Sequence, residues 1–161
     1  MKHQQGKEPA CGPGRHARWT VLHVDDDPND TLLLQAASRK AGVDFELVNV
    51  EDGDQAMAFL TRKGKSADGE HTREPALVLL DLKMPRANGF EILHWIRAHP
   101  RWNRIPVIVL SGSELQDDIR QAYAEGANSY LIKPLGFDSL VNLVKSISAV
   151  WLTSNFEMLG R

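Results

Sequence analysis

Acidic, hydroxyl and basic side chains stand directly after four of the five short apolar runs in this sequence. The residues are Asp25, Asp26 and Asp27 after TVLHV, Asp81 after LVLL, Ser111 after VIVL, and Lys133 after YLI. If the runs are strands of an open parallel sheet, their carboxyl ends meet at one edge, where such sheets collect their functional groups. We therefore expect these side chains to form one polar site.

The acidic residues of this site indicate a metal ion. Carboxylates that share a poorly solvated crevice repel one another, so a positive partner is needed. A hard divalent cation such as Mg²⁺ prefers oxygen ligands and is usually held by one or two carboxylates near a phosphate. We expect Asp25, Asp26, Asp81 and the backbone carbonyl of Lys83 to bind Mg²⁺, with Mn²⁺ as the alternative ion.

A carboxylate, a hydroxyl and a lysine beside such a metal fit phosphoryl transfer. That reaction needs an aligned nucleophile and donors on the phosphoryl oxygens. Asp81 would be the nucleophile, Lys133 the charge and Ser111 the hydroxyl. Each has an ordinary structural explanation as well. An Asp after a strand is often a turn former or helix cap, Ser111 before Gly112 can be a turn residue, and Lys133 can be a solvated surface charge. Their coincidence at four strand ends favours the chemical interpretation.

The elements that must position these groups alternate along the chain. Strands are predicted over residues 20–24, 45–50, 77–80, 107–110 and 129–132, and helices over about 28–41, 54–62, 89–99, 114–125 and 137–152. Three of the strands are continuously apolar, as in strands covered on both faces. Alternating strands and helices predict an α/β fold with a doubly wound, five-stranded parallel sheet. Residues 63–75 are predicted to be a long polar loop.

Composition indicates one globular domain. The chain has 161 residues, a formal net charge of -2 and a pI near 6.3, so no overall basic excess indicates a nucleic-acid partner. No apolar run reaches the roughly 18 residues of a membrane span, and the one cysteine, Cys11, cannot form an internal disulfide. We expect a cytoplasmic protein with a flexible tail at 1–18, a domain at 19–152 and a second tail at 153–161.

The reactive residues also form a known pattern: the chain resembles bacterial response regulator receiver domains from about Trp19 to Trp151. The matching residues are the acidic pair Asp25 and Asp26, the acceptor motif Asp81, Met84, Pro85 and Gly89, the pair Ser111 and Gly112, and Tyr130, Lys133 and Pro134. The resemblance implies a flavodoxin-like fold of three layers with strand order 2-1-3-4-5. It also implies that a histidine kinase phosphorylates Asp81.

The resemblance further implies how the signal would leave the domain. An aspartyl phosphate would pull Ser111 inward and let Tyr130 rotate toward the core, which changes the face formed by residues 114–125, 129–132 and 137–152. Lys83 and Ser113 occupy the positions that tune the lifetime of the phosphoryl group, and Lys83 is expected to slow its hydrolysis. Since residues 153–161 are too few for an output domain, we expect signalling by contact with a protein target that the sequence does not identify.

Within the family the chain is most similar to the small regulators that partner bacterial phytochrome kinases. The shared features are the DPND start of the first helix, the long loop before the third strand and a last helix that ends near Trp-Leu-Thr. By analogy, apolar residues on that helix would support a homodimer, namely Leu143, Ile147, Val150 and Trp151. Packing of half of these residues on the sheet explains them equally well.

Two other functions remain as alternatives. A phosphohydrolase of the haloacid-dehalogenase type would use Asp25 as nucleophile and Asp27 as acid, but no acidic pair follows Lys133 and no cap region is present. A receiver-like module that only binds partners would have no need of the acidic cluster. His23, inside the first strand, is interpreted as a packed side chain rather than a phosphorelay histidine.

Overall fold

A five-stranded parallel sheet forms the centre of the molecule. The structure is a computed structural model that describes residues 19–62, 73–85 and 87–154. The strands are β1 (Trp19–Val24), β2 (Phe45–Val50), β3 (Leu77–Leu80), β6 (Val107–Ser111) and β7 (Ser129–Ile132). Their order in the sheet is β2-β1-β3-β6-β7, and every neighbouring pair is parallel. This confirms the predicted doubly wound fold, in which the chain winds outward from β1 in both directions.

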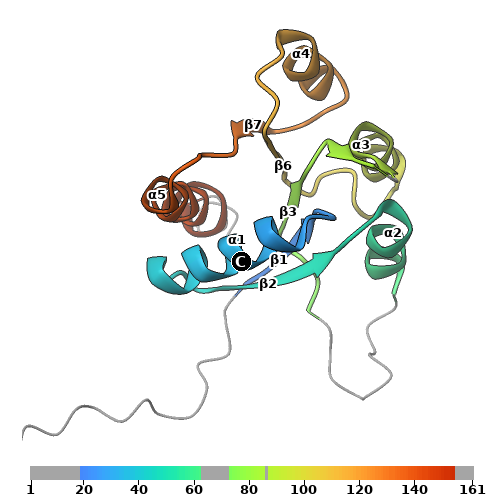
Figure 1. Cartoon of the computed structure of the whole chain (residues 1–161). Coiled ribbons are helices and arrows are strands. Elements are labelled where there is room, and N and C mark those ends of the chain that lie inside the picture. The colour runs from blue at the N-terminus through green and yellow to red at the C-terminus, as the bar shows by residue number, and fades with distance from the viewer. Residues whose placement is uncertain (1–18, 63–72, 86, 155–161) are drawn as a thin grey trace, which may run out of the picture.

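Helices cover both faces of the sheet and complete three layers (Figure 1). They are α1 (Pro28–Ala41), α2 (Gly53–Thr61), α3 (Gly89–Ala98), α4 (Gln116–Ala124) and α5 (Phe137–Ile147). Local signals set the ends of α1: the Asp27 side chain accepts a hydrogen bond from the Asn29 N–H, and Gly42 ends the helix in the left-handed region at φ 65°. All five helices confirm the sequence prediction, with ends that differ by a few residues.

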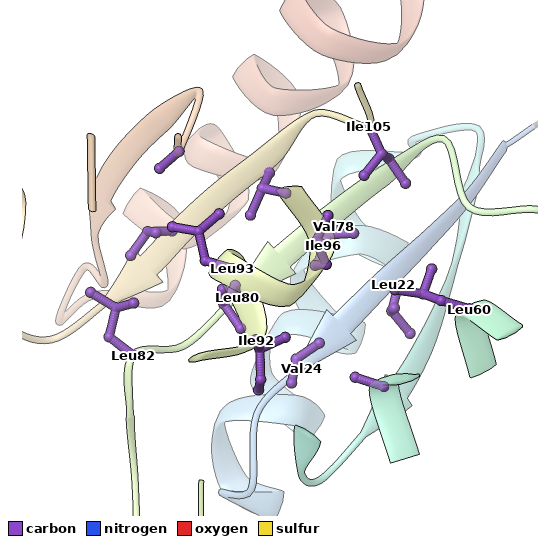
Figure 2. Packing of buried hydrophobic residues seen from close by; sticks show 14 of the residues in the cluster. Leu22, Val24, Leu60, Val78, Leu80, Leu82, Ile92, Leu93, Ile96 and Ile105 are labelled. Atoms are coloured by element: carbon purple, nitrogen blue, oxygen red, sulfur yellow. The ribbon is translucent and has the colours of Figure 1, made fainter. Parts of the chain in front are cut away.

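Successive side chains along each strand point to opposite faces of the sheet, and this alternation produces two apolar cores. On one face, Leu22 and Val24 of β1 pack with side chains from α2 and α3 (Figure 2), including Leu60, Ile92 and Ile96. On the other face, β1 residues of opposite parity join side chains from α1 and α5. Both layers bury the sheet, so β3 at its centre has all four residues buried. This explains why β3 reads as a continuously apolar run.

The C-terminal end of the fold differs from the prediction. The predicted α-helix to residue 152 ends at Ile147, and a π-helical turn, η1 (Ser148–Ser154), follows. Ile147 is buried, Leu143 and Trp151 pack partly against the core, and Val150 is 53% exposed. Packing therefore accounts for three of the four residues that had suggested a homodimer.

Two very short strands, β4 (Lys83–Met84) and β5 (Ala87–Asn88), pair antiparallel just after the acceptor position. They are not predicted from the sequence, because strands of two residues have no detectable periodicity. The predicted tail at 1–18 and residues 63–72 of the predicted loop lie outside the described residues, as do residues 155–161. Within the described part of the chain, no helix has the length and apolar character needed to cross a membrane.

Candidate phosphoryl-acceptor site

The predicted site residues meet at one edge of the sheet. Ladder hydrogen bonds continue to the strand ends and fix three of these residues: the backbone N–H of Asp25 donates to Val50, that of Asp81 to Val24, and that of Lys133 to Ser111. Parallel pairing therefore carries these residues to the same edge. Carboxylate oxygens of Asp25, Asp26 and Asp81 lie within 4.8 Å of one another. The predicted acidic cluster is confirmed as a geometric feature.

The ammonium of Lys133 lies inside this cluster. Its Nζ donates to Asp25 Oδ2 at 2.8 Å, to Asp30 Oδ2 at 2.7 Å and to Asp81 Oδ2 at 3.2 Å. An ammonium has three protons, so these contacts use all of them. Burial alone would lower the pKa of Lys133, but hydrogen bonds to Asp25 and Asp30 and the charge of Asp81 raise it. Lys133 is therefore charged at neutral pH.

The pKa values of the two buried carboxylates, Asp25 and Asp81, are shifted in opposite directions. Burial would raise the pKa of Asp25, yet the contact with His23, the hydrogen bond from Lys133 and the Asp27 N–H lower it to about 2. Burial raises the pKa of Asp81 above its usual value; the charge of Lys133 opposes this effect and the charge of Asp25 adds to it. Asp81 is thus the more basic carboxylate of the pair and, because basicity accompanies nucleophilicity, the better suited to attack.

The donor set fits a hard divalent cation. Three carboxylates contact one ammonium, and Asp26 adds a fourth carboxylate close to Asp25 and Asp81. This excess of negative charge in a half-buried crevice requires further positive charge. Oxygen ligands of this kind suit Mg²⁺ or Mn²⁺. The predicted ligand role of the Lys83 carbonyl stays a prediction; the Lys83 N–H donates to Asp81 Oδ1 at 3.2 Å.

Gly89 allows the backbone after Asp81 to fold closely over the first turn of α3. A Cβ atom at position 89 would lie 2.4 Å from the Asp81 carbonyl oxygen and 2.6 Å from the Leu82 Cα. Both are backbone atoms, so the contact could not be relieved by a side-chain rotation. The Gly89 N–H also donates to the Leu82 carbonyl at 3.2 Å. A glycine is therefore required here by space, and this position is part of the acceptor motif noted in the sequence.

Ser111, Ser113 and Tyr130 are joined by hydrogen bonds between the site and α4. Ser111 is fully buried, and its Oγ accepts the Ser113 N–H at 3.2 Å. The Tyr130 hydroxyl donates to the Ser113 carbonyl at 2.9 Å, and the Ser113 hydroxyl donates to Asp118 Oδ2 at 2.5 Å. The loop after β6 therefore connects the strand edge with the start of α4. Rotation of Tyr130 stays a prediction.

Three residues beside the site were missed or left without a role by the sequence analysis. Asp30 binds Lys133 from the first turn of α1, Asp118 binds Lys83 and Ser113 from α4, and His23 contacts Asp25 at 3.5 Å. The sequence did offer a signal for Asp30, which extends the acidic run that precedes α1. Asp30 is the third residue of α1, and side chains in a helix tilt toward its N-terminus, here toward the strand edge. The sequence contains no comparable signal for Asp118.

Comparison with known proteins agrees with this geometry. The family model described as the response regulator receiver domain matches residues 21–145. The response regulator Rcp1 of Synechocystis sp. is 37% identical over 132 residues, which cover 82% of this chain and 88% of that protein. A crystal structure of Rcp1 in its Mn²⁺-bound form has a TM-score of 0.71, 36% identity, and coverage of 84% and 96% of the two chains.

Two further solved structures are similar over the same region. The phosphorylated cyanobacterial phytochrome response regulator RcpA has a TM-score of 0.74 at 38% identity, covering 84% of this chain and 95% of that one. The response regulator RPA3017 in red light signalling of R. palustris has a TM-score of 0.75 at 33% identity, with coverage of 84% and 94%.

Proposed function

Because this chain belongs to the response regulator receiver domain family, we propose that it accepts a phosphoryl group from a histidine kinase on Asp81, with Mg²⁺ or Mn²⁺ as cofactor. The observation that carries this proposal is the convergence of Asp25, Asp26 and Asp81 within 4.8 Å, with the Lys133 ammonium 3.2 Å from Asp81. The two relatives solved as phosphorylated and Mn²⁺-bound forms support it.

In the proposed reaction, an Asp81 carboxylate oxygen attacks the phosphorus of a phosphohistidine. A P–O bond forms and the P–N bond breaks with its electron pair left on the imidazole nitrogen. The ring carries a proton from solvent on its other nitrogen, so it leaves as neutral imidazole. A cation held by Asp25, Asp26 and Asp81 would supply positive charge to the phosphoryl oxygens. One N–H of Lys133 already points toward Asp81. Once Asp81 is an acyl phosphate its carboxylate charge is gone, so this N–H can donate its hydrogen bond to a phosphoryl oxygen instead. The domain would catalyse only its own phosphorylation and dephosphorylation.

The output would be a change on the face formed by α4, β7 and α5. Ser111 is buried at the site edge, and Tyr130 is hydrogen-bonded to the loop that joins Ser111 to α4. A new phosphoryl group that draws in the Ser111 hydroxyl would strain this loop and shift Tyr130. A local change of charge would thereby alter a protein-binding surface.

The similarity to phytochrome response regulators supports a bacteriophytochrome kinase as the phosphoryl donor and a cytoplasmic location. The proposal includes a homodimer, because the apolar side chain of Val150 in η1 is 53% exposed. The downstream partner is a protein rather than nucleic acid, given the net charge of -2. Analytical ultracentrifugation with and without phosphorylation tests the dimer.

Burial disfavours the phosphohydrolase alternative. Asp25 would be its nucleophile, but Asp25 is 0% exposed and its two oxygens already accept the Asp27 N–H and the Lys133 ammonium. A carboxylate whose pKa lies near 2 is also a weak nucleophile. Turnover of a phosphomonoester that is lost in Asp25→Asn and kept in Asp81→Asn would support that alternative.

Phosphorylation by acetyl phosphate tests the main proposal. Intact mass is measured on the full chain with Mg²⁺, with EDTA, and for Asp81→Asn; Asp138→Asn, at an exposed aspartate paired with Lys40, is the matched control. We expect one phosphoryl group in wild type and in Asp138→Asn, and none in Asp81→Asn or in EDTA. Failure of the wild type to gain mass while it binds Mg²⁺ would favour a receiver-like module that acts by binding alone.

A further inference from the structure

His23 is a polar residue inside an apolar layer. It lies in β1 and is 2% exposed. Side chains two apart on a strand share a face, so His23 lies on the same face as Val21 and Asp25. That face packs against α1 and α5, and most strand residues on it are apolar, including Leu77 and Leu79 of β3. The polar exception beside His23 is its register partner Asn49 of β2, whose Oδ1 accepts the Thr31 hydroxyl at 3.1 Å. An apolar residue would satisfy packing at this position.

The two ring nitrogens of His23 have different surroundings. Nε2 lies 3.5 Å from Asp25 Oδ2. Nδ1 is buried without a hydrogen-bond partner, the one such side-chain nitrogen or oxygen among residues 19–62, 73–85 and 87–154. A buried N–H without an acceptor is unfavourable, and a carboxylate oxygen attracts a donor. The proton of the neutral ring therefore belongs on Nε2, where it faces Asp25.

This contact gives the Asp25 carboxylate a third donor, at Oδ2. The Asp27 N–H donates to Oδ1 at 2.9 Å and the Lys133 ammonium to Oδ2 at 2.8 Å. The His23 side chain that contacts the same carboxylate is 3% exposed. Burial opposes ionisation of Asp25, and the His23 contact is the strongest of the interactions that lower its pKa.

We propose that His23 is a positioning residue, which holds the Asp25 carboxylate in the orientation that binds the cation. The inference rests on the cation site of the proposed function. Donors that hold a metal-binding side chain from behind set metal affinity, and their loss typically weakens binding 10- to 100-fold. Removal of the ring should therefore weaken Mg²⁺ binding, and a side chain that keeps a donor in the place of Nε2 should restore it.

Calorimetric titration of the full chain with Mg²⁺, together with thermal unfolding in EDTA, tests this inference. His23→Leu removes both nitrogens and keeps an apolar side chain of similar size, whereas His23→Gln keeps a donor in the place of Nε2. His94→Leu is the control, because His94 forms a comparable contact with Glu125 at 3.3 Å on the surface. We expect Mg²⁺ affinity to fall roughly 10- to 100-fold in His23→Leu, to recover largely in His23→Gln and to stay unchanged in His94→Leu.

Rescue by His23→Gln separates positioning from packing. Because His23 also lowers the pKa of Asp25, we expect the midpoint of His23→Leu to fall and His23→Gln to restore it together with the Mg²⁺ affinity. Wild-type Mg²⁺ affinity in His23→Leu would overturn the inference and leave the proposed function intact. A loss of affinity that accompanies a lower midpoint, and that His23→Gln does not restore, would also overturn it in favour of packing. A wild type that does not bind Mg²⁺ would overturn the proposed cation site and this inference together.

Discussion

The ammonium of Lys83 lies 3.3 Å from Oδ2 of Asp118, so the residue two positions after the proposed acceptor Asp81 is paired with α4. The same oxygen accepts the Ser113 hydroxyl, and these two interactions lower the pKa of Asp118, the hydroxyl more than the ammonium. The Lys83 side chain is 59% exposed, and exposed ion pairs contribute little free energy. A doubly charged phosphoryl group on Asp81 would therefore compete with Asp118 for Lys83.

This competition predicts that Lys83→Ala and Asp118→Asn change the lifetime of the phosphoryl group in opposite directions. In Lys83→Ala, water reaches the acyl phosphate more easily, so we expect loss of the phosphoryl group to accelerate. In Asp118→Asn, Lys83 is released toward the phosphoryl group, so we expect loss to slow. About 1 kcal/mol in the barrier corresponds to roughly fivefold in each rate. The decay of phosphorylated protein, followed by intact mass after removal of acetyl phosphate, measures both.

Lys40→Ala is the matched control for this prediction, because Lys40 is an exposed lysine of α1 that pairs with Asp138 of α5. Its decay should equal that of wild type. Equal decay in wild type and Lys83→Ala would mean that Lys83 does not protect the phosphoryl group.

Asp81 is expected to destabilise the metal-free domain. Its raised pKa, caused first by burial and then by the charge of Asp25, means that the folded state disfavours the ionised form at neutral pH. Asp81→Asn should therefore raise the unfolding midpoint in EDTA; a change of ~1 kcal/mol moves the midpoint of a chain of this size by roughly 3 °C. Differential scanning calorimetry measures this change, and a lower midpoint for Asp81→Asn would contradict the prediction.

Asp25, whose pKa is shifted in the direction opposite to that of Asp81, is expected to stabilise the fold at neutral pH. Its pKa in the folded state is about 2, below the usual value of 3.8, so the stability that the ionised form contributes is present above pH 3.8 and is lost as the pH falls toward 2. The difference corresponds to ~2 kcal/mol. Urea unfolding of wild type and Asp25→Asn should show a larger stability difference at pH 7 than at pH 3. A difference that does not vary with pH would contradict this assignment.

Gly89→Ala is expected to displace the acceptor loop. The added Cβ would lie 2.4 Å from the Asp81 carbonyl oxygen, so the backbone must move. Such overpacking destabilises by roughly 1–3 kcal/mol, and the shift of Asp81 should also slow phosphorylation by acetyl phosphate. Gly112→Ala is the control for stability, because a Cβ at position 112 meets nothing within 4 Å. Equal urea midpoints for the two variants would contradict the close approach.

Mg²⁺ is expected to stabilise the folded chain through the acidic cluster. At a free concentration 100 times the dissociation constant, binding adds about 2.7 kcal/mol to the free energy of unfolding. Asp26→Asn removes one carboxylate of the cluster and should lose most of this gain, while Asp117→Asn, at an exposed residue of α4, should keep it. Unfolding midpoints in MgCl₂ and in EDTA measure the gain for each variant. An unchanged gain in Asp26→Asn would remove Asp26 from the site.

The order of strands and helices and the placement of the candidate site residues at one sheet edge could be predicted from sequence, because both depend on local patterns. Apolar runs such as LVLL indicate buried strands, and the residues after such runs must lie at the carboxyl edge of a parallel sheet. Asp25, Asp81, Ser111 and Lys133 followed from this reasoning. Gly42 and Asp27 likewise indicated the ends of α1 by local backbone chemistry.

Tertiary structure decided which partners these residues have. Lys133 contacts Asp30 across 103 positions of the chain, and Lys83 contacts Asp118 across 35, because the register of β7 beside β6 and the placement of α1 and α4 bring them together. No local pattern encodes such distances. Packing likewise buried Ile147 and isolated one nitrogen of His23, since the exposure of a side chain depends on the elements that cover it.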